Sequence, residues 1–184
     1  MFKNDLVPKI ISNDLIKNNQ SWKDFIPSMI YWPAIIIQII LVFFYYNVHN
    51  IYFLFWMGWV FMVLFLIIGS LPRSAFLKFG EIKKGKSHIY TTKLVDKGIY
   101  GIIRHPYWLC WTFLSISLTL ISQNIIMFIL ALIVLPIIYL ETFMLDKRLI
   151  NKFGEDYRQY QKSVPRMNLI LGIFKYIRRK RKYN

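Results

Sequence analysis

Two ionisable residues, Arg104 and His105, stand directly before a long apolar segment of the sequence. Charged and titratable side chains are costly to keep at a membrane boundary, so such a pair predicts a functional site by default. Pro106 follows them and suits the first turn of a helix, where the backbone N–H that proline lacks would be unpaired anyway. The sequence therefore places a cation and an imidazole at the membrane–water boundary, where a polar cofactor can meet a lipophilic substrate.

Apolar runs in the rest of the sequence are the elements that must hold this pair. The chain has 184 residues, of which 56% are hydrophobic, and its formal net charge is +15. Few soluble domains combine these properties. Four apolar runs carry almost none of the charge, at residues 29–46, 51–71, 107–122 and 125–140. Because a membrane span needs roughly 17 to 25 apolar residues, we expect an all-α fold with four transmembrane helices.

The distribution of basic residues predicts how these helices cross the membrane. The short connections at 47–50 and 122–124 contain no Lys or Arg, whereas the segment 72–105 contains eight and the part after Leu145 contains twelve more. Positively charged loops stay on the cytoplasmic side. We therefore expect an integral membrane protein made of two helical hairpins, with both termini and the central loop in the cytoplasm.

The chain is expected to form a single membrane domain over residues 1–184. Within it we expect an interfacial segment at 1–27, a cofactor region at 90–166 and a basic tail at 167–184. The tail favours anionic lipid head groups over nucleic acid as its partner. Pro72 is expected to end the second helix, and Gly154 to end the helix that continues from the fourth apolar run. The single cysteine, Cys110, excludes an intrachain disulfide and a cysteine-based metal site.

An ordered set of residues in the C-terminal half resembles a known family of membrane enzymes. It consists of Gly-x-Tyr-x-x-x-Arg-His-Pro at 98–106, a hydrophobic hairpin, an acidic helix, Phe-Gly-x-x-Tyr-x-x-Tyr at 153–160 and Val-Pro-Arg at 164–166. The set resembles the isoprenylcysteine carboxyl methyltransferases and, more widely, the phospholipid N-methyltransferases. The resemblance implies a small integral membrane enzyme that uses S-adenosylmethionine to methylate a lipophilic acceptor.

The resemblance also implies a cofactor pocket built from the central loop and the C-terminal helices. A first stretch matches the family segment that holds the adenosine end, and it comprises Thr92, Lys93, Leu94 and Val95. A second group surrounds the Arg-His pair and comprises Tyr100, His105, Pro106, Tyr107 and Trp108. The third contribution is Asp146, which can pair with the amino group of the cofactor. By its sequence alone Asp146 fits equally well as a solvated partner of its basic neighbours, and the tyrosines at 157 and 160 are expected to pack between helices.

This chain departs from the family pattern at several positions. The family has His where Thr92 stands, Tyr where Trp108 stands and Gly where Cys110 stands. Glu141 or Thr142 occupies the place of an arginine that the family assigns to substrate. This last departure favours an acceptor other than a prenylcysteine carboxylate. Three acceptors stay open: a lipid amine, a prenylcysteine-like or other lipophilic carboxylate, and a hydrophobic thiol.

Methyl transfer from a sulfonium is an in-line displacement, which depends on alignment of the reactants rather than on a metal or a nucleophilic side chain. Arg104 and His105 are expected to hold the carboxylate or another polar edge of the cofactor, while Tyr100 and Trp108 surround its nucleoside. No metal site is expected.

Two other functions stay open. An NADPH-dependent membrane reductase of the sterol-reductase type has a similar Arg-His-x-x-Tyr segment, although residues 107–110 lack the Asn and the acid usual in that group. A non-catalytic lipid-binding scaffold with a degenerate site would also fit the departures at Cys110 and at Glu141 or Thr142.

Overall fold

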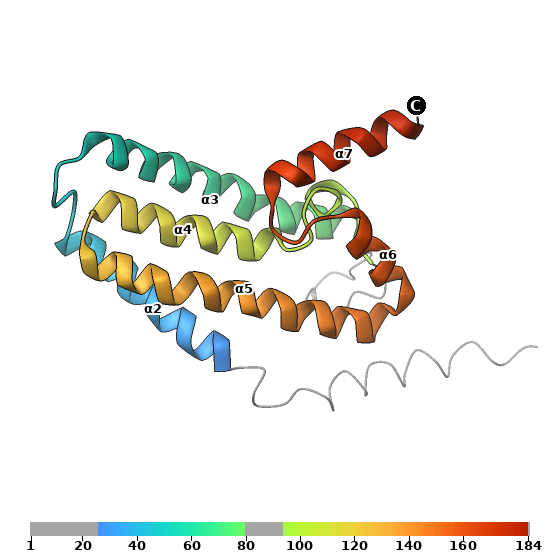
Figure 1. The fold of residues 1–184 in the computed structure, drawn as a ribbon, viewed down its shortest axis with the longest axis horizontal. Coiled ribbons are helices and arrows are strands. Elements are labelled where there is room, and N and C mark those ends of the chain that lie inside the picture. The colour runs from blue at the N-terminus through green and yellow to red at the C-terminus, as the bar shows by residue number, and fades with distance from the viewer. Residues whose placement is uncertain (1–25, 80–93, 184) are drawn as a thin grey trace, which may run out of the picture.

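Four long helices lie side by side and form the body of the protein (Figure 1). The computed structural model describes residues 26–79 and 94–183, and all regular structure in these residues is helical. The long helices are α2 (Ile26–Phe44), α3 (Tyr52–Phe79), α4 (Pro106–Ser122) and α5 (Ile125–Phe153). A 3-10 turn, η3 (Gly98–Gly101), and two shorter helices, α6 (Glu155–Ser163) and α7 (Leu169–Tyr183), complete the described part. The prediction of an all-α fold is confirmed for these residues.

Three of these helices, α2, α3 and α5, are long and apolar enough to cross a membrane. The fourth, α4, has 17 residues and stands at the short limit for a span. Large apolar side chains on the outer faces of α2, α3 and α5 are exposed, which is expected where the surrounding solvent is lipid. The helices therefore indicate an integral membrane protein, while the fourth span and the cytoplasmic position of the termini stay predictions.

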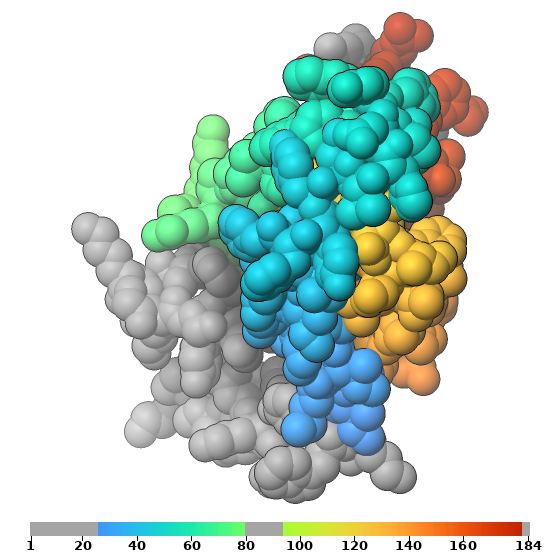
Figure 2. Space-filling model, turned by 90° about the vertical axis from the view of Figure 1, so that its left-hand side faces the viewer, coloured from blue at the N-terminus to red at the C-terminus, as the bar shows by residue number. Residues whose placement is uncertain are grey.

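Both hairpin turns lie at one end of the bundle and are bonded to each other. The Asn47 N–H donates to the Ile121 carbonyl over 3.0 Å, so the α2–α3 turn is joined to the end of α4. The Gln123 side chain then bonds the N–H and the carbonyl of Ile51, each over 2.9 Å. Figure 2 looks onto this end and shows the start of α5 beside the α2–α3 turn. The predicted site must consequently lie at the opposite end.

Helix α4 is the centre of the bundle and packs against α2, α3 and α5. Leu118 of α4 lies in one buried apolar cluster with Ile35 of α2 and Val134 of α5. On its other side α4 approaches α3 so closely that a Cβ atom on Gly58 would lie 2.7 Å from Ile121 Cγ1. This packing fixes the first turn of α4, and with it His105 and Pro106, relative to the other helices.

Helix ends differ from the sequence expectation at one proline. Helix α3 continues through Pro72 to Phe79, so the prediction that Pro72 ends it is wrong. Membrane helices tolerate proline because neighbouring groups can satisfy the backbone carbonyl that it frees, here that of Ile68, and Pro72 itself is buried within the fold. Gly154 does end α5, with a φ of 61°. Residues 1–25 of the expected interfacial segment lie outside the described residues. Residues 80–93 of the central loop lie outside them as well.

Candidate functional site

Arg104 and His105 are positioned by a short backbone pairing between two loops. The Arg104 N–H donates to the Pro165 carbonyl over 3.0 Å, and the His105 N–H donates to the Arg166 carbonyl over 3.1 Å. The loop that follows α6 is thereby held against the start of α4. Pro106 is the first residue of α4, as its type predicts, and leaves His105 as the residue that precedes the helix.

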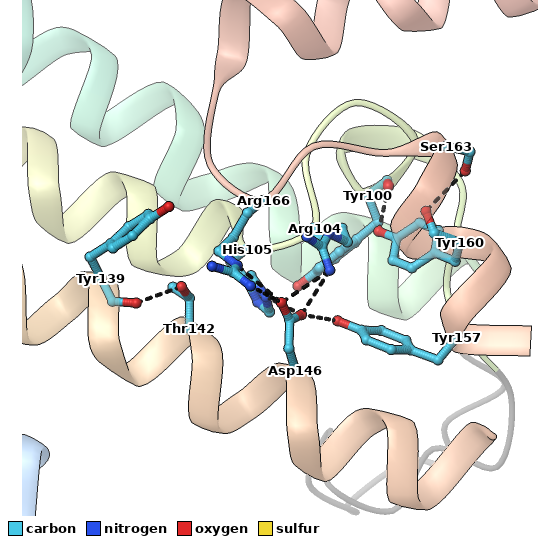
Figure 3. A network of polar contacts seen from close by, with 10 residues as sticks. All are labelled: Tyr100, Arg104, His105, Tyr139, Thr142, Asp146, Tyr157, Tyr160, Ser163 and Arg166. Carbon is cyan, nitrogen blue, oxygen red and sulfur yellow. Dashed lines mark hydrogen bonds and ion pairs between the residues drawn. The ribbon is translucent and has the colours of Figure 1, made fainter. Parts of the chain in front are cut away.

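Asp146 lies at the centre of the site (Figure 3). Its side chain projects from α5 and is 5% exposed. The Nη1 atom of Arg104 donates to both of its carboxylate oxygens over 3.0 Å, and the Nε2 atom of His105 lies 2.8 Å from Oδ1. The sequence placed Arg104 and His105 in one contribution to the predicted pocket and Asp146 in another, and the structure brings the three together. Asp146 is buried rather than exposed to solvent.

Two further residues complete the shell around Asp146. Arg166 donates to Oδ2 through Nε over 3.0 Å and through Nη2 over 2.8 Å. Its guanidinium also stacks on the Phe143 ring, with the carbon atom at its centre 3.5 Å from the ring centroid. On the other side, the Tyr157 hydroxyl donates to Oδ1 over 2.6 Å. One carboxylate therefore receives hydrogen bonds from four side chains that come from three separate parts of the chain.

The protonation states in this shell follow from burial and charge. Burial lowers the pKa of His105 below its usual value, although the Asp146 carboxylate opposes the shift. His105 is therefore neutral at physiological pH and donates its Nε2 proton to Asp146. Burial raises the pKa of Tyr157, and the bond to Asp146 raises it further, so the hydroxyl remains a donor. Two arginines face one carboxylate, which leaves the shell with a surplus of one positive charge.

That surplus is accompanied by an unpaired donor. The Nε atom of Arg104 is buried and has no hydrogen-bond partner among the described residues. A buried N–H without a partner costs free energy, and the cost is larger when the group is charged. The site is consequently suited to an additional anionic or acceptor group near Arg104.

A second polar contact connects α6 to the loop before Arg104. The Tyr160 hydroxyl donates to the Tyr100 carbonyl over 2.6 Å. Tyr160 also borders a hollow of about 330 Å³ whose lining includes Leu94, Val164 and Arg179. This volume is at the lower end of the range for small-molecule sites, about 300–1,000 Å³. The hollow contains one residue predicted to hold the adenosine end, Leu94, whereas Arg104, His105 and Asp146 do not line it.

The other predicted cofactor residues are spread around the start of α4. Val95 is buried at 7% exposure, while Tyr107 is 44% exposed on the outer surface. Trp108 packs edge-on against Tyr31 of α2, with the ring centroids 5.4 Å apart. Thr92 and Lys93 lie outside the described residues. In the part of the chain that is described, no group of three His, Cys, Asp or Glu side chains lies close enough together to hold a metal ion.

Sequence reasoning missed two members of the shell, Tyr157 and Arg166. Both stand in the motifs that carry the family resemblance, at 153–160 and 164–166, so the signal was present. Tyr157 does pack between helices as expected, in a buried cluster with Tyr160 and Val164, and its hydroxyl in addition bonds Asp146. The interpretation of Asp146 as a partner of its basic neighbours does not hold, since its ion pairs run to Arg104, His105 and Arg166.

Comparisons with known proteins give a family for this chain without giving an activity. Neither the curated proteins nor the solved structures include a significant match to the sequence. One family model, described as a protein of unknown function (DUF1295), matches residues 15–164 and so covers α2 to α6 and every residue of the Asp146 shell except Arg166. The chain belongs to this family, DUF1295.

Proposed function

We propose that this protein transfers a methyl group from S-adenosylmethionine to a lipophilic acceptor at the cytoplasmic face of the membrane. The observation that carries the proposal is the Asp146 shell, in which Arg104 and His105 meet an acid and leave one surplus positive charge at the end of a membrane bundle. A cofactor with an anionic carboxylate complements that charge, and apolar helices beside it give a lipid-borne acceptor access.

The residues present fit the polar end of this cofactor. Arg104 keeps a buried donor without a partner, and a carboxylate is the group that such a donor binds best. Asp146 can accept from the cofactor's amino group only in exchange for one of its present donors, of which His105 and Tyr157 are the two uncharged ones. The hollow beside Leu94 and Tyr160 would take the adenosine end, and the Tyr160 ring lies 5.6 Å from that of Tyr157, a member of the shell.

The residues of this chain contribute alignment and a fixed electrostatic environment. When bound, S-adenosylmethionine supplies the electrophilic methyl group, and well-aligned reactants can reach effective molarities of about 10⁵ M or more. The bonds between residues 104–105 and 165–166 keep the shell rigid, so little reorganisation is needed when the sulfonium charge disappears. His105, already neutral, can accept a proton on Nδ1 if the acceptor releases one.

The same surplus charge favours a second candidate, an NADPH-dependent reductase. Arginine binds phosphate groups as well as carboxylates, and the site holds two arginines, Arg104 and Arg166. The reductase requires a hydride donor instead of a methyl donor, so ligand binding separates the two proposals.

Ligand-dependent stabilisation of the purified full-length protein tests the proposal. S-adenosylmethionine at 100 times its dissociation constant should stabilise the fold by about 2.7 kcal/mol, and NADPH should not stabilise it at all. The Arg104→Gln variant should lose this stabilisation. The Arg158→Gln variant should keep it, because Arg158 is 61% exposed and its one ion pair within the described residues is with Glu155. Stabilisation by NADPH alone, or equal stabilisation of both variants by S-adenosylmethionine, would contradict the proposal.

Incubating membranes with methyl-tritiated S-adenosylmethionine would then identify the acceptor.

A further inference from the structure

The guanidinium of Arg166 has one nitrogen that its bonds to Asp146 do not use. Its Nε and Nη2 atoms both donate to Oδ2 of Asp146, over 3.0 and 2.8 Å. The third nitrogen, Nη1, has no acceptor among the described residues, yet it is not a buried atom like Nε of Arg104. The Arg166 side chain is 19% exposed. Arg166 can therefore offer the two N–H groups of Nη1 to a ligand outside the shell.

Two aromatic rings of α5 hold this guanidinium at the surface of the bundle. Its central carbon lies 3.5 Å from the centroid of the Phe143 ring and 5.7 Å from that of the Tyr139 ring. Figure 3 shows Tyr139 on the same side of Asp146 as Arg166, whereas Tyr157 lies on the other side. In the described part of the chain, the Tyr139 side chain contacts Phe143 and Arg166, and its hydroxyl forms no hydrogen bond. A second free donor thus lies beside Arg166.

Both rings belong to an exposed apolar stripe that runs the length of α5. Its members are three, four or seven positions apart, a spacing that places side chains on one helix face, and they comprise Ile125, Ile129, Leu132, Tyr139 and Phe143. Each of these side chains is between 40% and 66% exposed. We call this set the α5 stripe. Exposed apolar side chains on a membrane helix face the acyl chains of lipids, so a lipid lying along the α5 stripe reaches Arg166.

The position of Arg166 along α5 matches the depth of lipid phosphates. Helix α5 begins at Ile125, and Phe143 follows eighteen residues later, after about 27 Å of helix rise. The hydrocarbon core of a bilayer is about 30 Å thick. A guanidinium stacked on Phe143 consequently lies near the boundary between acyl chains and head groups, where tyrosine is also typical.

The charge of the shell favours an anion at this boundary. Asp146 pairs with both Arg104 and Arg166, which leaves one positive charge without a partner. A phosphate diester carries one negative charge, and its oxygens suit the paired N–H groups of a guanidinium. Arg104 keeps its unpaired Nε inside the shell, whereas Arg166 is the arginine that can meet an anion from the lipid side.

We propose that Arg166 and Tyr139 bind the phosphate of an anionic phospholipid whose acyl chains lie along the α5 stripe. Nη1 of Arg166 and the Tyr139 hydroxyl donate to the phosphate oxygens, so the lipid holds Arg166 from outside while Asp146 holds it from inside. This lipid is a bound component of the membrane and not the methyl acceptor. The site does not depend on the proposed function.

Binding of matched short-chain lipids to the full-length protein in a maltoside detergent tests the site. Dihexanoyl phosphatidylglycerol and dihexanoyl phosphatidylcholine share their chains and phosphate, but the second adds a quaternary ammonium that the surplus positive charge repels. We expect phosphatidylglycerol to bind about fivefold more tightly, the usual contribution of one cation at an anionic lipid surface. The affinities follow from the rise of the unfolding temperature with lipid concentration. Inorganic phosphate at equal concentration should give no rise, because it has no chains to lie on the α5 stripe.

A pair of tyrosine variants locates the binding. Tyr139→Phe keeps the ring and should weaken phosphatidylglycerol binding at least about tenfold, the effect of losing one hydrogen bond to a charged group. Tyr52→Phe removes the hydroxyl of a 69% exposed tyrosine at the start of α3, at the opposite end of the bundle, and should leave binding unchanged. Arg166→Gln should abolish the preference between the two lipids. If Arg166→Gln does not fold, the tyrosine pair still decides, because each of those variants changes one exposed hydroxyl.

Three results would overturn the proposal: equal binding of the two lipids by the wild type, unchanged affinity in Tyr139→Phe, or equal stabilisation by inorganic phosphate, which would indicate a site for free phosphate. None of them bears on methyl transfer, since stabilisation by S-adenosylmethionine is measured without added lipid. Lipid binding that depends on Tyr139, in a protein that S-adenosylmethionine does not stabilise, would disprove the proposed function and support the lipid site. The reverse result would disprove the lipid site alone.

Discussion

The Nη2 atom of Arg166 lies 2.8 Å from Oδ2 of Asp146, twenty residues earlier in the chain, and this ion pair closes the shell that Arg104 and His105 begin. Arg104 alone would neutralise Asp146, so Arg166 supplies the surplus positive charge of the site. Its guanidinium is held in place by the Phe143 ring, which comes from the same helix as Asp146. The loop after α6 is thus bonded to α5 and α4 through one residue.

Asp146→Asn tests how much stability depends on this shell. The substitution removes the negative charge and leaves the guanidinium groups of Arg104 and Arg166, whose side chains are 9% and 19% exposed, facing one neutral amide. Breaking a buried ion pair in this way costs about 3–5 kcal/mol, so we expect a loss of that size in the free energy of unfolding. Chemical denaturation in detergent measures it. Glu155→Gln, whose side chain is 64% exposed, should change it by less than about 0.5 kcal/mol. Similar values for the two variants would contradict the structural role of Asp146.

The helices could be predicted from the sequence, whereas the composition of the shell could be predicted only in part. Long apolar runs are a strong signal because the bilayer leaves few alternatives to a helix. The run at 51–71 lies in α3 except for Ile51, and the run at 125–140 lies in α5. The start of α4 at Pro106 and the end of α5 at Gly154 followed from residue type. Pro72 did not act as a stop, because context in a membrane helix overrides the local preference.

The contacts of Tyr157 and Arg166 depend on tertiary structure that no local pattern specifies. Arg166 reaches Asp146 because the loop around Pro165 pairs with the backbone of Arg104 and His105. Tyr157 reaches Asp146 because α6 folds back after Gly154. Periodicity places both tyrosines of α6 on one face but does not say which partner each hydroxyl has. The same limit applies to Glu141, whose partner Ser28 lies 113 residues away.

A pair of tyrosine variants tests whether Tyr157 belongs to the shell. Tyr157→Phe removes a hydroxyl that bonds a carboxylate, which contributes about 1.5–3 kcal/mol. Tyr160→Phe removes one that bonds the neutral Tyr100 carbonyl, which contributes about 0.5–1.5 kcal/mol. Both rings are buried, so the variants differ mainly in the charge of the acceptor. Denaturation should therefore find Tyr157→Phe the less stable variant, and the opposite order would show that the contact with Asp146 contributes little.

The depressed pKa of His105 predicts a dependence of stability on pH. In the unfolded chain His105 has a pKa near 6.5, and in the folded protein burial holds its pKa lower. Between these two values the unfolded state binds more protons, so stability rises with pH there. The contribution of His105 is fully present above about pH 6.5 and is lost as the pH falls toward the folded pKa.

His105→Gln provides the matched variant for this pH dependence. Its side-chain amide can donate to Asp146 in place of Nε2 but does not titrate. Unfolding free energies measured from pH 8 down to pH 5 should decline more steeply for the wild type than for this variant. Parallel curves would show that His105 is not the neutral donor that its burial indicates.

The close approach of α3 and α4 predicts opposite behaviour for two glycines of α3. A Cβ on Gly58 would lie 2.7 Å from Ile121 Cγ1 and 2.9 Å from its backbone nitrogen, so the helices must move apart. The Ser117 hydroxyl, which donates to the Gly58 carbonyl over 2.8 Å, would also lose its geometry. Gly58→Ala should therefore reduce the free energy of unfolding by about 1–3 kcal/mol.

Gly69→Ala is the control on the same helix. Its Cβ would lie 3.6 Å from Cys110 Sγ, an ordinary contact, and alanine favours the helix over glycine by up to about 1 kcal/mol. This variant should be as stable as the wild type or slightly more stable in the same denaturation experiment. Because α4 begins at Pro106, displacement of α4 by Gly58→Ala should also weaken ligand binding at Arg104 and His105, and Gly69→Ala should not. A Gly58→Ala protein with unchanged stability would mean that α3 and α4 are not in the close contact that positions the site.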